Sequence, residues 1–436
     1  QTDQRGGYLR EMIAATDALA GGVFQDLKIL DFTWVGVGPI TTKYFADHGA
    51  DVIRIESLSR PDVLRGAPPF KDASPGINRS QFSANYNTSK RGLGLNLTIE
   101  ESRNIVCRLI TEWKPDVIAE SFTPRVMRSW GLDYETVSKL RPDLVYFSTC
   151  QLGQTGPHSS YAGFGQLAGS LAGFYVLTGW PDREPSGPYG AYSDFLNPPM
   201  AFGAIVAALD HRDRTGAGQY LDLSQFEGAT HFLAPYIMKY IEDGTVPSRV
   251  GNADSHFTPH GIFRCKDENR EFVGEGESWV AISVREECQW HALSALIGTE
   301  GDRRFDTEEG RRVNSAQLGL IIEAWTSKVG AQDAMGILQD MGIPAGAVQS
   351  QADLWQDPQL KHMDYFQWIP HPELGSMPYD GLQFKMLDTP GRLSRPQAMI
   401  GEHNEEVLRD CLGLTGFEIQ RLSESGALEH SIGMDK

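Results

Sequence analysis

The stretch LKILDFTWVGVGPITTKYFADHGADVIRIE, residues 27–56, decides the fold. It opens on an apolar, β-prone run at 27–33, which the turn Gly36-Val37-Gly38-Pro39 follows. A helical pattern then covers 40–48, and a second apolar run covers 50–56. A strand, a glycine turn, a helix and another strand in this order are typical of a parallel sheet with helical crossovers. The stretch therefore predicts the first unit of an α/β domain.

The same alternation recurs further along the chain. Thr98 is expected to begin a helix, with Glu101 three residues later as in a capping box. The apolar runs 116–119 and 143–148 are typical of buried strands. Residues 150–200 are rich in Gly, Ser, Tyr and Pro, which inside an α/β enzyme favours an active-site loop over a linker. This half of the chain is predicted to be a doubly wound α/β domain.

Composition limits the possible partners. The 436 residues exceed one small core, and the net charge of -18 argues against nucleic acid or an anionic membrane as a partner, since both need a basic face. Five cysteines without a CxxC pair favour a reducing cytoplasm over a disulfide framework or zinc site. The most apolar stretch, 202–209, is far shorter than the roughly 20 residues of a membrane span. We expect a cytoplasmic protein without a metal, a nucleic-acid partner or a membrane partner.

The Gly36-x-Gly38 turn raises the alternative of a nicotinamide dehydrogenase. A dinucleotide fingerprint has a third glycine, and here that glycine is missing and Pro39 interrupts the pattern. Glu56 ends the second strand, which supports the fingerprint in part. A tight strand-to-helix turn is the simpler interpretation of both glycines.

Basic residues gather near expected strand ends and helix starts. Ligands of parallel sheets bind beyond the carboxyl ends of the strands, so these cations are candidates for phosphate contacts at one edge. Solvated surface charge is the alternative for each. The candidates are Arg54, Arg60, Lys90, Arg91, Arg125 and Arg128.

Asp194 lies in the aromatic-rich segment 188–195. A helix is expected from Pro198, with Asn197 as its N-cap, because Asn is a preferred cap and Pro is favoured at the first helical position. Asp194 is then left without a structural role, which makes its carboxylate a candidate for catalysis.

Ten motifs, in one order from about residue 25 to the C-terminus, resemble those of the class III CoA-transferase family. This family includes formyl-CoA, crotonobetainyl-CoA and benzylsuccinate CoA-transferases. One such string would be weak, but ten in the family's order are specific. Among them are LKILDFTxxxxGP (27–39), GADVIRIE (49–56), NTSKRGLGLNL (87–97), ESFTPRVM (120–127) and AYSDFLNPP (191–199).

The resemblance implies an α/β fold with a Rossmann-like large domain built from both chain ends. We expect residues 24–245 and 345–436 in this domain, 246–344 in a smaller α+β domain, and 1–23 as an N-terminal extension. The family also implies an interlocked dimer, either a homodimer or a heteromer with a related subunit.

The resemblance also assigns site residues. The family's catalytic aspartate precedes the helix that ends at the turn His211–Gln219, and the matching residue is Asp194. Ser57 stands where the family has a basic residue, and Arg60 is expected to replace that residue. The other expected coenzyme A (CoA) contacts come from three loops: Val35, Gly36 and Val37; Lys90, Arg91, Leu95 and Asn96; and Ser121, Phe122, Arg125 and Arg128.

The implied activity is transfer of CoA from an acyl-CoA donor such as succinyl-CoA to a carboxylic acid, through an aspartyl mixed anhydride. GPYGAYSDF (187–195) and SHFTPHGIF (255–263) point to a benzylsuccinate-like acceptor. No permanently bound cofactor or metal is expected, because the CoA thioester is a substrate. Two alternatives stay open: an acyl-CoA racemase, which would have a histidine base near Phe164, and a non-catalytic subunit, against which Asp194 argues.

Overall fold

The computed structural model describes residues 22–270 and 274–431, so the expected extension 1–23 lies almost wholly outside the described residues. The chain divides into two compact units. The large unit comprises the residues up to 174, 188–245 and those from 364 onward, and the small unit comprises 175–187 and 246–363. Residues 175–187 and 345–363, which we expected in the large domain, thus fall in the small unit.

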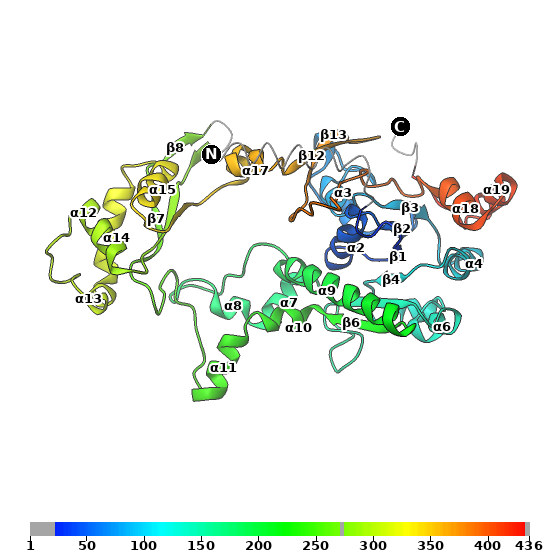
Figure 1. Cartoon of the computed structure of the whole chain (residues 1–436), viewed down its shortest axis with the longest axis horizontal. Coiled ribbons are helices and arrows are strands. Elements are labelled where there is room, and N and C mark those ends of the chain that lie inside the picture. Colours follow the sequence, from blue (N-terminus) through cyan, green and yellow to red (C-terminus); the bar gives the residue numbers. More distant parts are fainter. Residues whose placement is uncertain (1–21, 271–273, 432–436) are drawn as a thin grey trace. The chain divides into compact units, whose positions relative to one another are not determined.

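A six-stranded sheet organises the large unit, with the strand order β3-β2-β1-β4-β5-β6 (Figure 1). Every neighbouring pair is parallel. This is the doubly wound order. The order in which strands are added reverses between β1 and β4, and this reversal leaves a crevice for ligands. The strands are β1 (Lys28–Asp31), β2 (Asp51–Glu56), β3 (Arg91–Gly94), β4 (Val117–Glu120), β5 (Val145–Cys150) and β6 (Tyr220–Ser224).

Alternate residues of the strands build two cores on opposite faces of the sheet, because successive side chains of a strand point to opposite faces. Ile29 and Val117 pack with α2 (Val37–Asp47) and α9 (Tyr192–Thr215) on one face. Leu30 and Ile118 pack on the other face with three helices: α4 (Glu100–Arg108), α18 (Asn404–Leu412) and α19 (Gly416–Glu424). The predicted α/β class, with a large domain made from both chain ends, is confirmed.

The C-terminal segment also covers the edge strand β3. The backbone N–H groups of Gly92 and Gly94 donate to His403 Nδ1 at 3.0 Å and to Asn404 Oδ1 at 2.8 Å. Glu429 donates its own N–H to the carbonyl of Gly94 at 3.1 Å. Side chains and backbone from the far end of the sequence therefore occupy the hydrogen-bonding groups that an edge strand would otherwise expose.

The small unit has a three-stranded antiparallel sheet in the order β11-β10-β7 and a separate β8–β9 hairpin. Helices complete its own core, which includes Val280, Leu293 and Leu318. Its strands are β7 (His260–Arg264), β8 (Glu268–Arg270), β9 (Gly274–Gly276), β10 (Trp279–Ser283) and β11 (Ala345–Ala347). Its helices are α12 (Glu287–Ile297), α13 (Glu308–Val313), α14 (Ser315–Thr326), α15 (Ala331–Asp340), α16 (Gln351–Gln356) and α17 (Pro358–His362).

No helix among the described residues is long and apolar enough to cross a membrane. Shorter elements complete the fold. The remaining helices are η1 (Val63–Gly66), η2 (Lys71–Ala73), α3 (Gln81–Asn85), η3 (Leu109–Trp113), α5 (Val126–Ser129), α6 (Tyr134–Leu140), α7 (Gly165–Ala172), α8 (Phe174–Leu177), α10 (Gln225–His231) and α11 (Ala234–Asp243). The hairpin β12 (Phe366–His371) and β13 (Gly375–Asp380) belongs to the large unit.

Two expected helix starts are wrong. Helix α9 begins at Tyr192, so Asn197 and Pro198 lie inside it, and the buried Asn197 side chain donates to the carbonyl of Ser193 at 2.7 Å. Helix α4 begins at Glu100 without a side-chain cap, because the Thr98 hydroxyl donates to Asn96 instead. Asp194 therefore lies in the first turn of α9, inside the helix and not ahead of it.

Candidate active site

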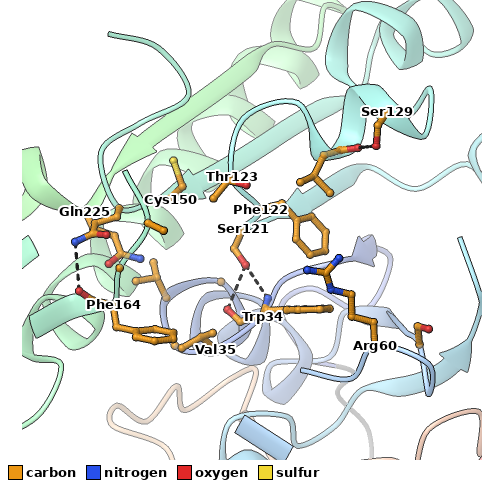
Figure 2. A pocket seen from close by; sticks show the side chains of 18 of the residues that line it. Trp34, Val35, Arg60, Ser121, Phe122, Thr123, Ser129, Cys150, Phe164 and Gln225 are labelled. Atoms are coloured by element: carbon orange, nitrogen blue, oxygen red, sulfur yellow. Dashed lines mark hydrogen bonds between the residues drawn. The ribbon is translucent and has the colours of Figure 1, made fainter. Parts of the chain in front are cut away.

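A cavity of about 890 Å³ opens in the large unit beyond the carboxyl ends of the parallel strands (Figure 2). Segments that follow β1, β2, β3, β4 and β5 contribute to its wall, as expected for the crevice of a doubly wound sheet. The predicted site residues that line it are Val35, Gly36, Val37, Arg60, Asn96, Ser121, Phe122 and Asp194.

Asp194 is 6% exposed and lies between two glycines. A Cβ on Gly36 would stand 2.9 Å from the Asp194 Cβ and 3.0 Å from Oδ2, and a Cβ on Gly165 would stand 2.5 Å from Oδ1. Gly36 has an ordinary φ of -105°, so the close approach, and not the backbone conformation, requires glycine there. The two glycines leave room for the carboxylate and for backbone on either side of it.

Three helix starts converge on this carboxylate. Gly36 is the N-cap of α2, Gly165 is the first residue of α7, and Asp194 itself lies in the first turn of α9. The first N–H groups of a helix have no partner within the helix and carry partial positive charge. The surroundings of Asp194 therefore favour a negative charge, both on the carboxylate and on an oxyanion beside it.

Burial acts in the opposite direction. In the part of the chain that the structure describes, no group donates a hydrogen bond to the Asp194 carboxylate, and burial raises the pKa of Asp194 to about 7. A carboxylate with a raised pKa is more basic than an exposed one, which strengthens it as a nucleophile once it is ionised. The site thus holds an ionisable group with no structural partner at the base of an open cavity.

An aromatic wall borders the cavity. The rings of Trp34 and Phe122 lie 5.3 Å apart, and those of Phe122 and Trp130 lie 5.4 Å apart, both edge to face. Figure 2 shows the Ser121 hydroxyl beside Trp34, where it accepts the backbone N–H of Trp34 at 2.7 Å. This wall offers apolar surface to a ligand in the cavity.

Arg60 supplies positive charge at the cavity, on a loop that the C-terminal segment holds. The Glu429 carboxylate accepts the Ser57 hydroxyl and the Leu58 N–H, each at 2.7 Å. The Ser57 hydroxyl is thereby committed to protein. Arg60 is the cation that this loop presents to the cavity, and its contact with CoA stays a prediction.

Residues 24–404 match the model of CoA-transferase family III. The chain belongs to CoA-transferase family III. The predicted family is confirmed, and the chain is an enzyme of the class III CoA-transferase type, whose substrates are CoA thioesters.

Curated relatives resemble this CoA-transferase over most of its length. An acetyl-CoA:oxalate CoA-transferase of Acetobacter aceti is 31% identical over 80% of this chain and 86% of its own. A succinate–glutarate CoA-transferase of Agrobacterium fabrum is 29% identical over 88% and 94%. A succinyl-CoA–D-citramalate CoA-transferase of Chloroflexus aurantiacus is 27% identical over 91% and 96%.

Solved structures share the fold. A CAIB/BAIF family protein from Brucella suis superposes with a TM-score of 0.79 at 28% identity, covering 90% of this chain and all of that one. Rv3272 from Mycobacterium tuberculosis superposes with a TM-score of 0.74 at 22% identity over 88% and 99%, a likeness of fold alone.

Three predicted CoA contacts of this CoA-transferase do not fit the structure, because their side chains lie outside the cavity. Lys90 is 1% exposed and donates to Asp31, to the Pro39 carbonyl and to Asn87, and burial lowers its pKa to about 8. Arg91 begins β3 at the opposite, amino-terminal edge of the sheet, where it forms ion pairs with Asp51 and Glu406. Leu95 is wholly buried in the core.

Arg125 and Arg128 lie in a second cavity of about 460 Å³, which shares Thr123 and Ser159 with the first. Arg128 forms exposed ion pairs with Asp133 and Glu135. The structure thus separates the six predicted basic residues: two are buried, one is ion-paired at the far edge, one lines the cavity and two lie beside it, in the order Arg54 and Lys90, Arg91, Arg60, and Arg125 and Arg128.

Sequence reasoning missed several residues of the wall. Cys150 ends β5 and Gln151 follows it, where the fold rule alone would have placed ligand contacts. Burial raises the pKa of Cys150 to about 11, so it remains a neutral thiol. Gly165 carried no chemical signal, since its contribution is the absence of a side chain. Among the described residues, no group of three or more His, Cys, Asp and Glu side chains could hold a metal ion.

Gly165→Ala is expected to lower kcat about 100-fold, because the new Cβ would displace the Asp194 carboxylate and a misplacement of roughly 1 Å can cost that much. Steady-state kinetics with an acyl-CoA donor measure the change. Gly203→Ala on α9 is the matched control, since a Cβ there meets nothing within 4 Å. Equal activity of both variants would show that the fit around Asp194 is not critical.

Asp194→Asn is expected to stabilise the fold at about pH 8, by an amount on the order of a few kcal/mol at about 1.4 kcal/mol per pKa unit. Because burial raises the folded pKa to about 7, the carboxyl favours folding while protonated and opposes it as pH rises through that value. Urea midpoints at about pH 8 and pH 4 measure the gain, which should vanish at the lower pH. Asp388→Asn, at an exposed position, is the matched control for the substitution itself.

Proposed function

We propose that this CoA-transferase uses Asp194 as the nucleophile that transfers CoA between two carboxylic acids. Asp194 bears first an acyl group and then CoA. The observation that supports this role is the buried Asp194 carboxylate, which lies at the cavity between Gly36 and Gly165 without a hydrogen-bond donor among the described residues. A carboxylate that no neighbour occupies is free to form covalent bonds with a thioester.

In the first half-reaction, an Asp194 oxygen attacks the donor thioester carbonyl. The C–S bond breaks, the CoA thiolate leaves, and a mixed anhydride forms between Asp194 and the donor acyl group. The thiolate then attacks Cγ of Asp194 and forms an aspartyl thioester. The donor acid departs with the bridging oxygen, so Asp194 has lost one of its original oxygens.

The second half-reaction reverses these steps with the acceptor. An acceptor carboxylate oxygen attacks Cγ of the aspartyl thioester, the C–S bond breaks, and a second anhydride forms. The CoA thiolate attacks the acceptor acyl carbon, which yields the new thioester and returns the Asp194 carboxylate. Each intermediate remains an activated acyl group, so no step loses the energy of the thioester bond.

Backbone N–H groups are the proposed oxyanion donors. The starts of α2 and α7 lie on either side of the carboxylate, at Gly36 and Gly165. Each preorganised donor is worth roughly 3 kcal/mol when it faces a developing oxyanion. The proposal explains why two helix starts approach one aspartate.

Racemisation, the alternative with the same fold, needs a second acid–base group opposite the aspartate. No histidine is among the residues that line the described cavity, and Phe164 lies in its wall. These observations support transfer over α-proton exchange. A non-catalytic subunit would not need the close fit of both glycines around Asp194.

We propose succinyl-CoA as the donor and a benzylsuccinate-like acid as the acceptor. Two of the relatives named above are described as using succinyl-CoA or succinate, which supports the donor. The aromatic wall of Trp34, Phe122 and Trp130 supports an acceptor with an aromatic ring. The smaller acids of the relatives, glutarate and citramalate, are the competing acceptors.

The chain is also proposed to act as a dimer, as the family resemblance implies. Helix α11 supports this, because none of its residues is buried while Tyr236, Met238, Tyr240 and Ile241 are exposed. Exposed apolar residues on one helix are typical of a surface that another chain covers.

Turnover with an acceptor acid labelled with ¹⁸O in its carboxylate is expected to leave the label on Asp194. The mechanism returns one acceptor oxygen to the aspartate in each cycle. Mass spectrometry of the peptide that contains Asp194 measures the incorporation, and Asp194→Asn should abolish both label and turnover. Transfer that leaves Asp194 unlabelled would contradict the anhydride route.

An acceptor screen with succinyl-CoA is expected to favour benzylsuccinate over glutarate and citramalate in kcat/KM. The preference should exceed about fivefold, because an aromatic ring on an aromatic wall is worth on the order of 1 kcal/mol beyond the area that it buries. Product thioesters are measured by mass spectrometry. Acetyl-CoA as a second donor separates donor preference from acceptor preference, and a preference for glutarate would overturn the proposed acceptor.

A further inference from the structure

The turn that brings Gly36 to Asp194 contains a residue in an unfavourable backbone conformation. Val35 has a φ of 66°, in the left-handed region that β-branched residues rarely adopt. Such a conformation persists only where the surrounding structure holds it. The hydrogen bonds of the turn identify the groups that do so.

Asp62 holds the backbone of Val35. The Val35 N–H donates to Oδ2 of Asp62 at 3.1 Å and to Oδ1 at 3.3 Å. The same carboxylate caps η1 by accepting the Leu64 N–H at 3.0 Å, and it is 1% exposed. Asp62 thus joins the turn after β1 to the segment after β2.

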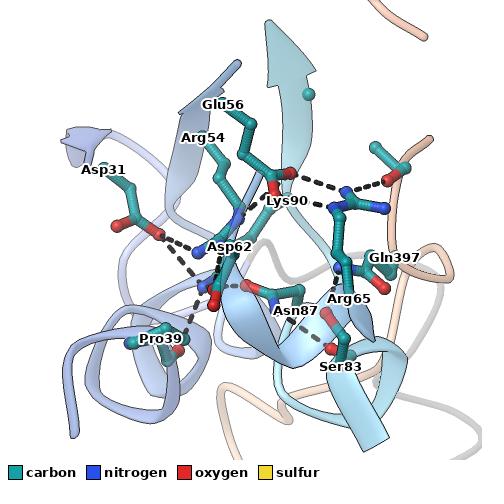
Figure 3. Close-up of polar contacts among 12 residues, drawn as sticks. Asp31, Pro39, Arg54, Glu56, Asp62, Arg65, Ser83, Asn87, Lys90 and Gln397 are labelled. Carbon is teal, nitrogen blue, oxygen red and sulfur yellow. Dashed lines mark hydrogen bonds and ion pairs between the residues drawn. The ribbon is translucent and has the colours of Figure 1, made fainter. Parts of the chain in front are cut away.

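Arg54 holds Asp62 and the turn at the same time, and Figure 3 shows its contact with Asp62. Its Nη2 donates to Oδ2 of Asp62 at 2.8 Å, and its Nη1 donates to the carbonyl of Thr33 at 2.8 Å. Glu56 lies 3.3 Å from the Arg54 Nε and is itself bound by both nitrogens of an Arg65 fork. The guanidinium is therefore fixed from the side away from the turn.

The opposite side of the turn is held by Ser121, which follows β4. Its hydroxyl accepts the backbone N–H of Trp34 at 2.7 Å and lies 3.2 Å from the backbone carbonyl of Trp34. Directly after these attachments in the chain, Gly36 approaches Asp194 so closely that a Cβ would have no room. A small displacement of the turn would change the distance from the start of α2 to the carboxylate.

We propose that Asp62, oriented by Arg54, is a positioning residue for the transfer reaction: it holds Val35 in its left-handed conformation so that the start of α2 faces Asp194. Asp62 is not among the residues that line the cavity. The inference rests on the proposed role of Asp194 as the nucleophile. It assigns to a buried acid a role that neither its burial nor its charge would indicate.

Asp62→Asn tests the proposal, because the amide keeps the shape of the side chain but has one acceptor oxygen and no charge. It therefore cannot accept from Val35, Arg54 and Leu64 together, as the carboxylate does. We expect kcat to fall about 10- to 100-fold, since a misplacement of roughly 1 Å can cost about 100-fold. KM for the acyl-CoA should change less than kcat, because the substitution alters the approach of the α2 start to Asp194 while every side chain that lines the cavity is kept.

A second substitution separates positioning from general support of the fold. Glycine adopts a left-handed φ without steric cost, so Val35→Gly in the Asp62→Asn background should recover at least about threefold in kcat. Val35→Gly alone is the reference for the lost side chain, since Val35 lines the cavity. A purely structural role of Asp62 predicts no such recovery.

Asp47→Asn is the matched control. Asp47 is equally buried, ends α2 and accepts the hydroxyls of Thr88 and Ser89 at 2.9 Å and 2.6 Å, away from the turn. Its loss should lower the urea midpoint while kcat stays unchanged. If Asp62→Asn does not fold, Arg54→Lys with the same Val35→Gly rescue replaces it, because lysine cannot bind Thr33 and Asp62 as a planar fork does.

Unchanged kcat in Asp62→Asn, or a Val35→Gly double variant no faster than the single one, would overturn the proposal. These outcomes differ from failure of the proposed function. Full turnover by Asp194→Asn would refute the proposed role of Asp194 as the nucleophile, whatever the activity of Asp62→Asn. An inactive Asp194→Asn together with a fully active Asp62→Asn would refute the positioning role of Asp62 alone.

Discussion

The closeness of three backbone segments around one carboxylate is the constraint on which the site depends. Glycine at 36 and 165 lets the starts of α2 and α7 approach the first turn of α9 to contact distance. Burial disfavours the charge on Asp194 while the helix starts favour it. Burial raises the pKa of Asp194 to about 7, which suits the nucleophile that we propose it to be, because such a group is both basic and partly ionised near neutral pH.

Most of the architecture was predictable from the sequence, because apolar runs and glycine turns follow directly from the period of strands and helices. Residues 27–56 form β1, α2 and β2 as expected. The start of α9 was not predictable from local rules. Asn197 and Pro198 are a favoured pair at a helix start, yet α9 starts before them at Tyr192, where the buried Ser193 and Asn197 side chains bond to the carbonyls of Gly165 and Gln225. Local preference was overridden by burial.

The site was predictable in part. The errors in the predicted basic contacts have one cause. Sequence position places a basic residue at a strand end but does not say which face or edge it reaches. Lys90 turns inward to Asp31, and Arg91 pairs with Asp51 at the far edge, whereas Arg60 reaches the cavity. Gly165 could not be recognised by chemistry at all, because a missing side chain matters only once its neighbour is known.

The covering of β3 by the C-terminal segment has a consequence for the order of folding. The bonds from Gly92 and Gly94 to His403 and Asn404 join residues more than 300 positions apart, with the whole small unit made in between. Contacts of such sequence separation form late. A growing chain therefore carries an open sheet edge until synthesis has passed α18, and open edges invite pairing with other chains. The edge of β3 is where nascent molecules of this enzyme would need a chaperone most.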